Sequence, residues 1–350
     1  MKKSVRRSSS AVDLLALAEC VERFEGKRVV VLGDFVADSF QSGDITRVSR
    51  EAPVLILRHR DTRIMPGGGA NAANNFAALG ARVLPISTVG DDEAGDQLIS
   101  SFREKKVDVS GILRNKGRVT PTKTRFLAGW AHTVGQQVLR VDYEPRTALD
   151  PQQTKRIAAL LKSRCGNADA LAISDYGFGV ATPELVSAIS RQLRGRIPVS
   201  LDSRYGLAKY RRAGVTTATP NEPELEAAHN TTIGSNVGEL ERCGRATLQG
   251  MKLDSLVVTR GKDGMAVFEP GKPTVHVPIH GSDEAVDVTG AGDTVLAAYT
   301  LGLASGASPV EAANIASIAG GLVVMKRGTA TVARKELLDA IRKAASELTA

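Results

Sequence analysis

Short apolar runs alternate with longer stretches of helical periodicity along most of this chain. The apolar runs lie at 28–32, 82–88, 170–174, 198–202, 216–219 and 255–259, and helical patterns separate them at 69–79, 93–105, 151–164, 183–194 and 240–251. Nearly continuous apolar strands are typical of strands buried on both faces. The pattern therefore predicts an α/β protein with a mostly parallel sheet that helices cover on both sides.

Two segments, 44–64 and 118–143, break this rhythm because they alternate like β-strands and lack a helical repeat. They predict one small sheet, built from two insertions, that projects from the main body as a lid. A flat exposed sheet favours association, so we expect a homodimer that pairs two lids. No internal repeat or long linker is visible.

The formal net charge of +8 changes this picture little. Four of the positive charges come from Lys2, Lys3, Arg6 and Arg7, in a Ser-rich tail that we expect to lie outside the fold. Aromatic residues make up only 4% of the chain, and no basic run is interleaved with them. A nucleic-acid partner is therefore not expected.

Compartment signals favour the cytoplasm. Asp13 and Glu19 bracket the apolar run at 14–18, which therefore predicts an amphipathic helix and not a signal peptide. No stretch reaches the ~20 apolar residues of a membrane span, so no membrane partner is expected. Cys20, Cys165 and Cys243 are few, odd in number and far apart, as in a reducing compartment without structural disulfides.

The segment 287–293 (DVTGAGD) carries the strongest chemical signal. Its glycines, Gly290 and Gly292, leave backbone N–H groups unobstructed, and a helix-forming run follows at once, so the segment predicts an anion site at a helix N-terminus. Asp293 lies in the first turn, where we expect it to stay ionised. An anion site beside a carboxylate suits phosphoryl transfer to a hydroxyl. The alternative is a turn that caps a buried helix.

A glycine-rich segment and two acids form a second candidate site. The segment 66–74 (PGGGANAAN) opens a helix, its glycines allow close approach of a ligand, and Asn71 can hydrogen-bond to hydroxyls; a flexible hinge is the alternative. Asp34 and Asp38 follow the first strand and suggest carboxylates that bind sugar hydroxyls, with Asp38 preferred. A helix cap or Asx-turn is the alternative for either acid.

Two further strand ends are candidates for nucleotide contacts. Asn221 and Glu224 are spaced either as a capping box or as a pair that orients metal-bound water near a triphosphate. The segment 259–264 (TRGKDG) predicts a hairpin turn, whose Gly and Lys could contact a phosphate or ribose.

Several chemistries are excluded. The chain has no P-loop motif, no nucleophile elbow and no C-x-x-C pair. His276 and His280 lie in a proline-broken strand pattern, which disfavours a zinc site. The glycines at 67–69 lack the spacing of a dinucleotide fingerprint, which disfavours a nicotinamide-dependent oxidoreductase.

Together these motifs resemble the ribokinase-like (PfkB) family of carbohydrate kinases, over about 28–334. The resemblance implies a three-layer α/β/α sandwich with a β-sheet lid, in which 1–27 form a tail and helix and 28–345 the kinase domain. Within the family, the strings at 49–54, 136–142, 174–176 and 219–222 look most like the heptose 7-phosphate kinases of ADP-heptose synthesis.

The resemblance also implies roles for individual residues. Asp293 would be the catalytic base, with the anion hole at Gly290, Ala291 and Gly292. The nucleotide would lie along Asn221, Glu224, Thr259, Gly261, Gly264 and Asn314, and the sugar against Asp38, Gly68, Gly69, Asn71, Arg125 and Asp142. ATP and Mg²⁺ are the implied cofactors, with Glu224 near the magnesium and Asp287 near a monovalent cation such as K⁺.

The chain departs from the heptose kinase pattern at two places. Phe178 stands where those kinases have a Lys in Asp-Tyr-x-Lys-Gly, and 202–206 (DSRYG) replaces Asp-Pro-Lys/Arg-Gly. The remaining candidates for binding a substrate phosphate are Lys123, Arg125, Arg140 and Arg204.

The sequence thus predicts an ATP-dependent kinase that converts a sugar or sugar phosphate, with D-glycero-β-D-manno-heptose 7-phosphate to the 1,7-bisphosphate as the first candidate. A kinase for ribose, fructose, a fructose phosphate or a nucleoside is an alternative, as is a sugar- or nucleotide-binding sensor without turnover.

Overall fold

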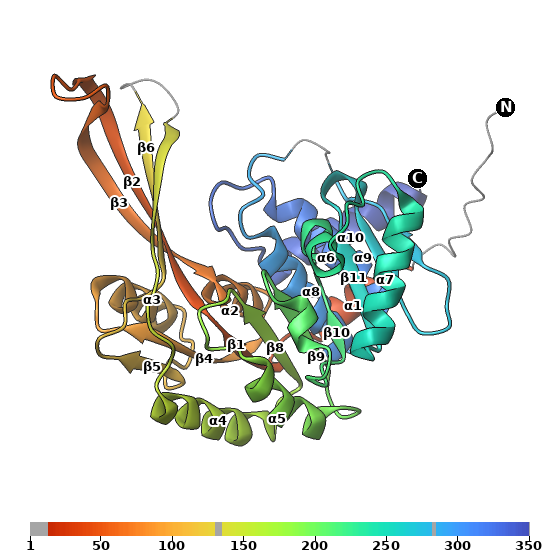
Figure 1. The fold of residues 1–350 in the computed structure, drawn as a ribbon. Helices are drawn as coiled ribbons and strands as arrows, with labels where there is room; N and C mark the ends of the chain where they lie inside the picture. The colour runs from red at the N-terminus through yellow and green to blue at the C-terminus, as the bar shows by residue number, and fades with distance from the viewer. Residues whose placement is uncertain (1–12, 130–134, 282–284, 350) are drawn as a thin grey trace.

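The computed structural model describes residues 13–129, 135–281 and 285–349 (Figure 1). The predicted basic tail at 1–12 and part of the second lid segment, 130–134, lie outside the described residues. Helix α1 (Leu14–Glu22) begins at the predicted apolar run, and its N-cap Asp13 accepts hydrogen bonds from the N–H groups of Leu15 and Ala16. The predicted helix there is confirmed.

The main sheet has nine strands. Their order is β13 (Val275–Val277), β12 (Met265–Phe268), β11 (Ser255–Thr259), β10 (Thr217–Ala218), β9 (Val199–Ser203), β8 (Ala170–Asp175), β1 (Arg28–Gly33), β4 (Arg82–Gly90) and β5 (Ile112–Asn115). Among the described strands of this sheet, β12 runs antiparallel to both of its neighbours, β11 and β13, and the other pairs are parallel. Each apolar run singled out in the sequence contributes a strand, so the mostly parallel sheet is confirmed.

Helices cover both faces of this sheet, as predicted. One buried cluster includes side chains of α1, α2 (Gly69–Ala78), α3 (Glu93–Glu104), α8 (Ala291–Ala304), α9 (Pro309–Val323) and α10 (Arg334–Thr349). The other includes α4 (Pro151–Cys165), α5 (Pro183–Leu193), α6 (Glu222–His229) and α7 (Val237–Met251). Val29 and Val31 of β1 belong to the first cluster, Val30 and Leu32 to the second, because successive strand residues point to opposite faces.

A second sheet rises from the body, at the upper left of Figure 1. Its four strands are β3 (Leu55–Gly68), β2 (Phe35–Val48), β6 (Thr122–Gly129) and β7 (Gln136–Tyr143), paired in that order. We call this sheet the lid. It is built from two chain segments, as predicted, but its first two strands reach further into the body than 44–64. Asp38 consequently lies within β2, and Gly67 and Gly68 pair with β2 as strand residues, not as a hinge.

The three cysteines are buried and free. Within the described parts of the chain, no helix is both long enough and apolar enough to span a bilayer.

Helix α7 packs so closely on β12 that one position excludes any side chain. A Cβ atom at Gly244 would lie 2.3 Å from Cζ of Phe268, a fully buried ring. In contrast, a Cβ at Gly250 of the same helix would meet nothing within 4 Å.

We therefore expect Gly244→Ala to lower the free energy of unfolding by ~1–3 kcal/mol, because the ring must shift in a packed core. The matched Gly250→Ala should instead raise it by up to ~1 kcal/mol, since alanine favours the helix. Urea denaturation of both variants measures these changes. Equal effects in the two variants would contradict the packing argument.

Candidate active site

A cavity of about 350 Å³ opens between the lid and the carboxyl ends of the central strands. Ligands collect at this edge in open α/β sheets. Many of the residues predicted from the sequence line it, namely Asp38, Gly68, Arg125, Asn221, Glu224, Thr259, Gly290, Gly292 and Asp293. The structure thus brings the two motifs, far apart in the sequence, to one place.

Other predicted residues do not line the cavity, namely Gly69, Asn71, Asp142, Gly261, Gly264, Asp287, Ala291 and Asn314. Asp142 is paired on β7 with Arg140, whose Nε lies 2.7 Å from its Oδ1. Asn314 donates from Nδ2 to the Val310 carbonyl, one turn back in α9. Asn71 is fully buried and hydrogen-bonds to Asp293, which lines the cavity.

Helix α8 starts at the cavity without a side-chain cap. Its N-cap Gly290 has a φ of 80°, and a Cβ there would lie 2.5 Å from Nδ2 of Asn71, so both backbone and packing require glycine. Gly292, the next glycine, faces open space. An uncapped helix N-terminus leaves N–H groups for an anion, which supports the predicted anion hole.

Asp293 is buried at this helix start. Asn71 donates from Nδ2 to its Oδ2 at 2.7 Å, and the Tyr176 hydroxyl lies 3.4 Å from its Oδ1. Burial raises the pKa of Asp293 to about 7, against the hydrogen bond from Asn71, and the charge of Asp38 raises it further. Burial thus opposes the ionised form that we expected the helix N-terminus to favour. A pKa near neutrality suits a general base.

The two acids after β1 have different roles. Asp38 lines the cavity and forms an ion pair with Arg125, whose Nη1 lies 2.6 Å from Oδ1. Asp34 is buried and accepts hydrogen bonds from the N–H groups of Tyr176, Phe178 and Val180. Burial raises its pKa to about 6, although these hydrogen bonds oppose the shift. Asp34 therefore fixes the 176–180 loop, a structural role that differs from the helix cap or Asx-turn considered as the alternative.

Asn221 and Glu224 form the capping box at the start of α6. The Glu224 N–H donates to Asn221 Oδ1 at 2.8 Å, and the Asn221 N–H donates to Glu224 Oε2 at 2.9 Å. Both side chains also line the cavity. A capping box at the start of α6 is therefore compatible with a second role of the same two side chains near a nucleotide.

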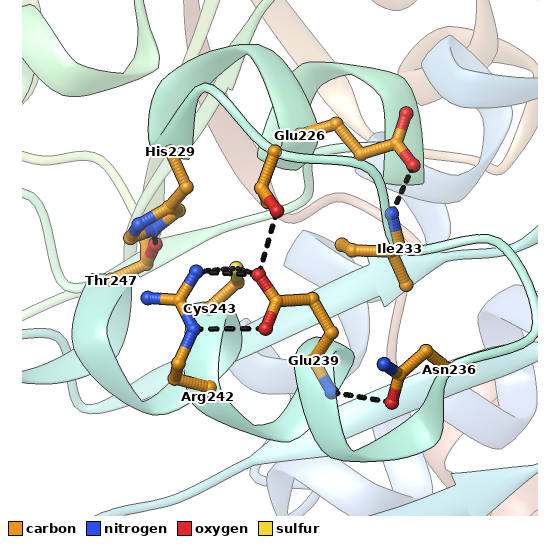
Figure 2. Close-up of polar contacts among 9 residues, drawn as sticks. Glu226, His229, Ile233, Asn236, Glu239, Arg242, Cys243 and Thr247 are labelled. Carbon is orange, nitrogen blue, oxygen red and sulfur yellow. Dashed lines mark hydrogen bonds and ion pairs between the residues drawn. The ribbon is translucent and has the colours of Figure 1, made fainter.

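The other end of α6 is anchored to α7 by polar contacts (Figure 2). Glu226 accepts a hydrogen bond from the Ile233 N–H in the connecting loop. His229 Nε2 lies 2.7 Å from the Thr247 hydroxyl, and Glu239 accepts from the hydroxyl of Thr231 at 2.7 Å. These contacts hold α6 in place, and with it the capping box at the cavity edge.

Sequence reasoning gave no role to Tyr176, Asp202 or Thr329, which also line the cavity. Tyr176 directly follows β8, and Asp202 lies near the end of β9, so the rule that sites gather at carboxyl ends of strands could have found both. No sequence signal pointed to Thr329. Burial raises the pKa of Asp202 well above its usual value, and the nearby charges of Glu224 and Asp293 add to the shift.

Four cationic side chains line the cavity. Lys123, Arg125 and Arg140 belong to the lid, and Arg204 belongs to the loop after β9. Two of them, Arg125 and Arg140, are paired with carboxylates. Lys123 and Arg204 lie 5.2 and 6.0 Å from the Tyr176 ring centre, and within the described residues neither forms an ion pair. Burial lowers the pKa of Lys123, and the charge of Arg204 lowers it further. Such a region favours an anionic ligand.

No group of three His, Cys, Asp or Glu side chains in the described residues could hold a metal by itself. Burial raises the pKa of Glu224, whose charge in turn raises that of Asp202. Two carboxylates that disfavour each other's charge suit Mg²⁺, which keeps several waters and binds through one or two carboxylates plus phosphate oxygens. The donor set therefore fits a magnesium ion shared with a nucleotide.

The chain resembles solved kinase structures in fold. It matches a ribokinase from Arabidopsis thaliana complexed with ribose and ATP, with a TM-score of 0.69 at 18% identity, over 91% of this chain and 99% of that one. It also matches phosphofructokinase-2 from Escherichia coli in complex with potassium, with a TM-score of 0.73 at 20% identity, over 92% and 99%. The predicted ribokinase-like sandwich is confirmed.

Sequence similarity is closer to a longer protein. The chain is 39% identical over 314 residues to the bifunctional protein HldE of Geobacter sulfurreducens. The matched region covers 89% of this chain and 62% of that relative. The chain thus spans a little less than two thirds of that protein. The pfkB carbohydrate kinase model matches residues 27–336. The chain therefore belongs to the pfkB family of carbohydrate kinases.

Proposed function

We propose that this protein transfers the γ-phosphate of ATP to a hydroxyl of a sugar phosphate. The observation that carries the proposal is Asp293, a buried carboxylate with a pKa of about 7 beside the uncapped N-terminus of α8. Asp293 accepts the hydroxyl proton as the sugar oxygen bonds to phosphorus and the bond to ADP breaks. The N–H groups of α8 stabilise the charge on the transferred phosphoryl group.

The cationic region supports a substrate that already carries a phosphate. Lys123 and Arg204 have no carboxylate partner among the described residues, so a substrate phosphate can neutralise them. The Lys of the heptose kinase motif is replaced here by Phe178, and we infer that the lid and the loop after β9 bind the phosphate instead. The similarity to HldE and the shared motifs favour D-glycero-β-D-manno-heptose 7-phosphate, giving the 1,7-bisphosphate.

Magnesium and a monovalent cation complete the proposal. Glu224 and Asp202 are placed to hold Mg²⁺, which supplies positive charge at the phosphates. Asp287 is the candidate near K⁺, and phosphofructokinase-2 is known in complex with potassium. The Asp287 carboxylate accepts hydrogen bonds from the N–H groups of Thr289 and Gly328, both at 2.9 Å. Burial alone would raise the pKa of Asp287, but these hydrogen bonds hold it below the usual value.

We further infer that 28–345 form the kinase domain and that two lids pair in a homodimer. The lid exposes large apolar side chains, namely Val48, Val54, Leu55, Val138 and Leu139. Burying such side chains between two copies would stabilise a dimer. Free, buried cysteines and ATP as phosphate donor support a cytoplasmic location.

We expect Asp293→Asn to reduce kcat by ~10²–10⁴-fold, since the amide cannot accept the hydroxyl proton. ADP release from ATP with a panel of free and phosphorylated sugars measures this, and ATP affinity should change little. Turnover with no sugar of the panel would favour the sensor alternative. Near wild-type kcat in the variant would remove Asp293 from the role of base.

The same substitution should stabilise the protein at high pH. Burial raises the pKa of Asp293 from 3.8 to about 7, so the folded chain binds a proton that the unfolded chain has lost. The contribution of Asp293 to wild-type stability therefore falls as pH rises from about 4 to 7, whereas Asn does not titrate. We expect Asp293→Asn to gain up to ~4 kcal/mol relative to the wild type between pH 4 and 8. Parallel stability curves for the two proteins would contradict the raised pKa.

Lys123→Met and Arg204→Met should each raise KM for the sugar phosphate by ~10–100-fold. This is the loss of affinity expected when one hydrogen bond to a charged group is removed. KM for ATP should change less than about threefold, because the phosphates of ATP lie at α8. Lys155→Met, an exposed position on α4, is the matched control. Equal loss of affinity for free sugars and sugar phosphates would contradict this role of the cationic region.

A further inference from the structure

A continuous line of buried polar side chains leads away from Asp293 into the space between α2 and α8. The Thr294 hydroxyl donates to Asn75 Oδ1 at 2.7 Å, and Asn75 Nδ2 donates to Asn71 Oδ1 at 3.3 Å. Asn71 Nδ2 donates in turn to Asp293 Oδ2 at 2.7 Å. Thr294, Asn75 and Asn71 are fully buried, so water cannot replace any of these hydrogen bonds.

The direction of each hydrogen bond follows from a backbone group. Asn75 Nδ2 also donates to the backbone carbonyl of Asn71 at 3.0 Å, and a carbonyl can only accept. The amide nitrogen of Asn75 must therefore face Asn71, and its oxygen must face Thr294. Because Asn71 Oδ1 receives this hydrogen bond, the amide nitrogen of Asn71 points to Asp293.

We propose that Thr294 and Asn75 are positioning residues that hold the Asn71 amide with its nitrogen toward the catalytic carboxylate. Neither of them touches the cavity, and they act through Asn71. The inference rests on the proposed role of Asp293 as the base. A reversed Asn71 amide would place its oxygen against the carboxylate, and this repulsion would disfavour the ionised form that accepts a proton.

The same line of hydrogen bonds links the two motifs mechanically. Asn71 and Asn75 belong to α2 after the glycine-rich strand end, whereas Thr294 and Asp293 belong to the first turn of α8. The lid strand β3 continues directly into α2, so the helix that carries Asn71 and Asn75 begins where the lid ends. Asn75 thereby assists the reaction without contacting a substrate.

The test compares Thr294→Val, which removes the hydroxyl at nearly constant volume, with Thr294→Ser, which retains it. The pKa of Asp293 is read without substrate, from the pH dependence of the Tm difference between each variant and the same variant carrying Asp293→Asn. We expect Thr294→Val to move this midpoint up by about half a pH unit or more, because the Asn71 hydrogen bond to the carboxylate weakens. Thr294→Ser should keep the wild-type midpoint.

In the kinase assay, Thr294→Val should lower kcat by ~10-fold or more and move the acid limb of the kcat/KM profile to higher pH, with KM for ATP unchanged. Thr300→Val is the matched control. Thr300 lies on the same helix, is equally buried, and its hydroxyl has no hydrogen-bond partner among the described residues. Thr300→Val should leave both kcat and the pH midpoint of the Tm difference near the wild-type values.

Asn75→Leu provides a second variant, with an expected midpoint shift in the same direction and at least as large. An unchanged midpoint in Thr294→Val, or an equal shift in Thr300→Val, would overturn the proposal. Absence of kinase activity in the wild type would overturn the proposed function instead, while the midpoint comparison would still decide on the positioning residues.

Discussion

The candidate active site depends on one buried carboxylate, Asp293, at the start of a helix that has no side-chain cap. Burial of Asp293 and the charge of Asp38 oppose its ionisation, whereas the hydrogen bond from the Asn71 amide favours it, and its pKa is raised to about 7. A carboxylate of this kind requires a hydrogen-bond donor held toward it and, at the start of the helix, a residue without a side chain. Asn71 is the first, and Gly290 is the second.

The rest of the fold serves to bring these groups together. The parallel strands end at one edge, where the loops after β8 and β9 and the capping box of α6 surround the cavity. Buried Asp34 holds the 176–180 loop through three backbone N–H groups, so Tyr176 stands beside the base. The lid is continuous with β1 and α2, and its strands carry Asp38, Lys123 and Arg125 to the opposite wall.

The cavity separates charge in a way that matches a phosphorylated substrate and a nucleotide. Carboxylates from β9, α6 and α8 gather on the body side, where their burial and mutual repulsion favour protonation or a bound cation. The lid contributes Lys123, Arg125 and Arg140 to the cavity, and the loop after β9 contributes Arg204; Lys123 and Arg204 lie over the Tyr176 ring. A sugar phosphate that spans the cavity would meet cations at one end and the base at the other, with the phosphates of ATP at α8.

The sequence by itself determined three features: the alternation of strands and helices along the chain, the lid built from two insertions, and the two motifs that meet at the cavity. These features depend on local periodicity and on backbone needs of single residues, which neighbouring residues already reveal. Only the tertiary structure decided the rest: that Asp34 holds the 176–180 loop, that Asn71 hydrogen-bonds to Asp293 and does not line the cavity, and that burial raises the pKa of Asp293. Asn71 and Asp293 are 222 positions apart. Hydrogen-bond partners and pKa values follow from burial and from such distant contacts, and no local pattern records either.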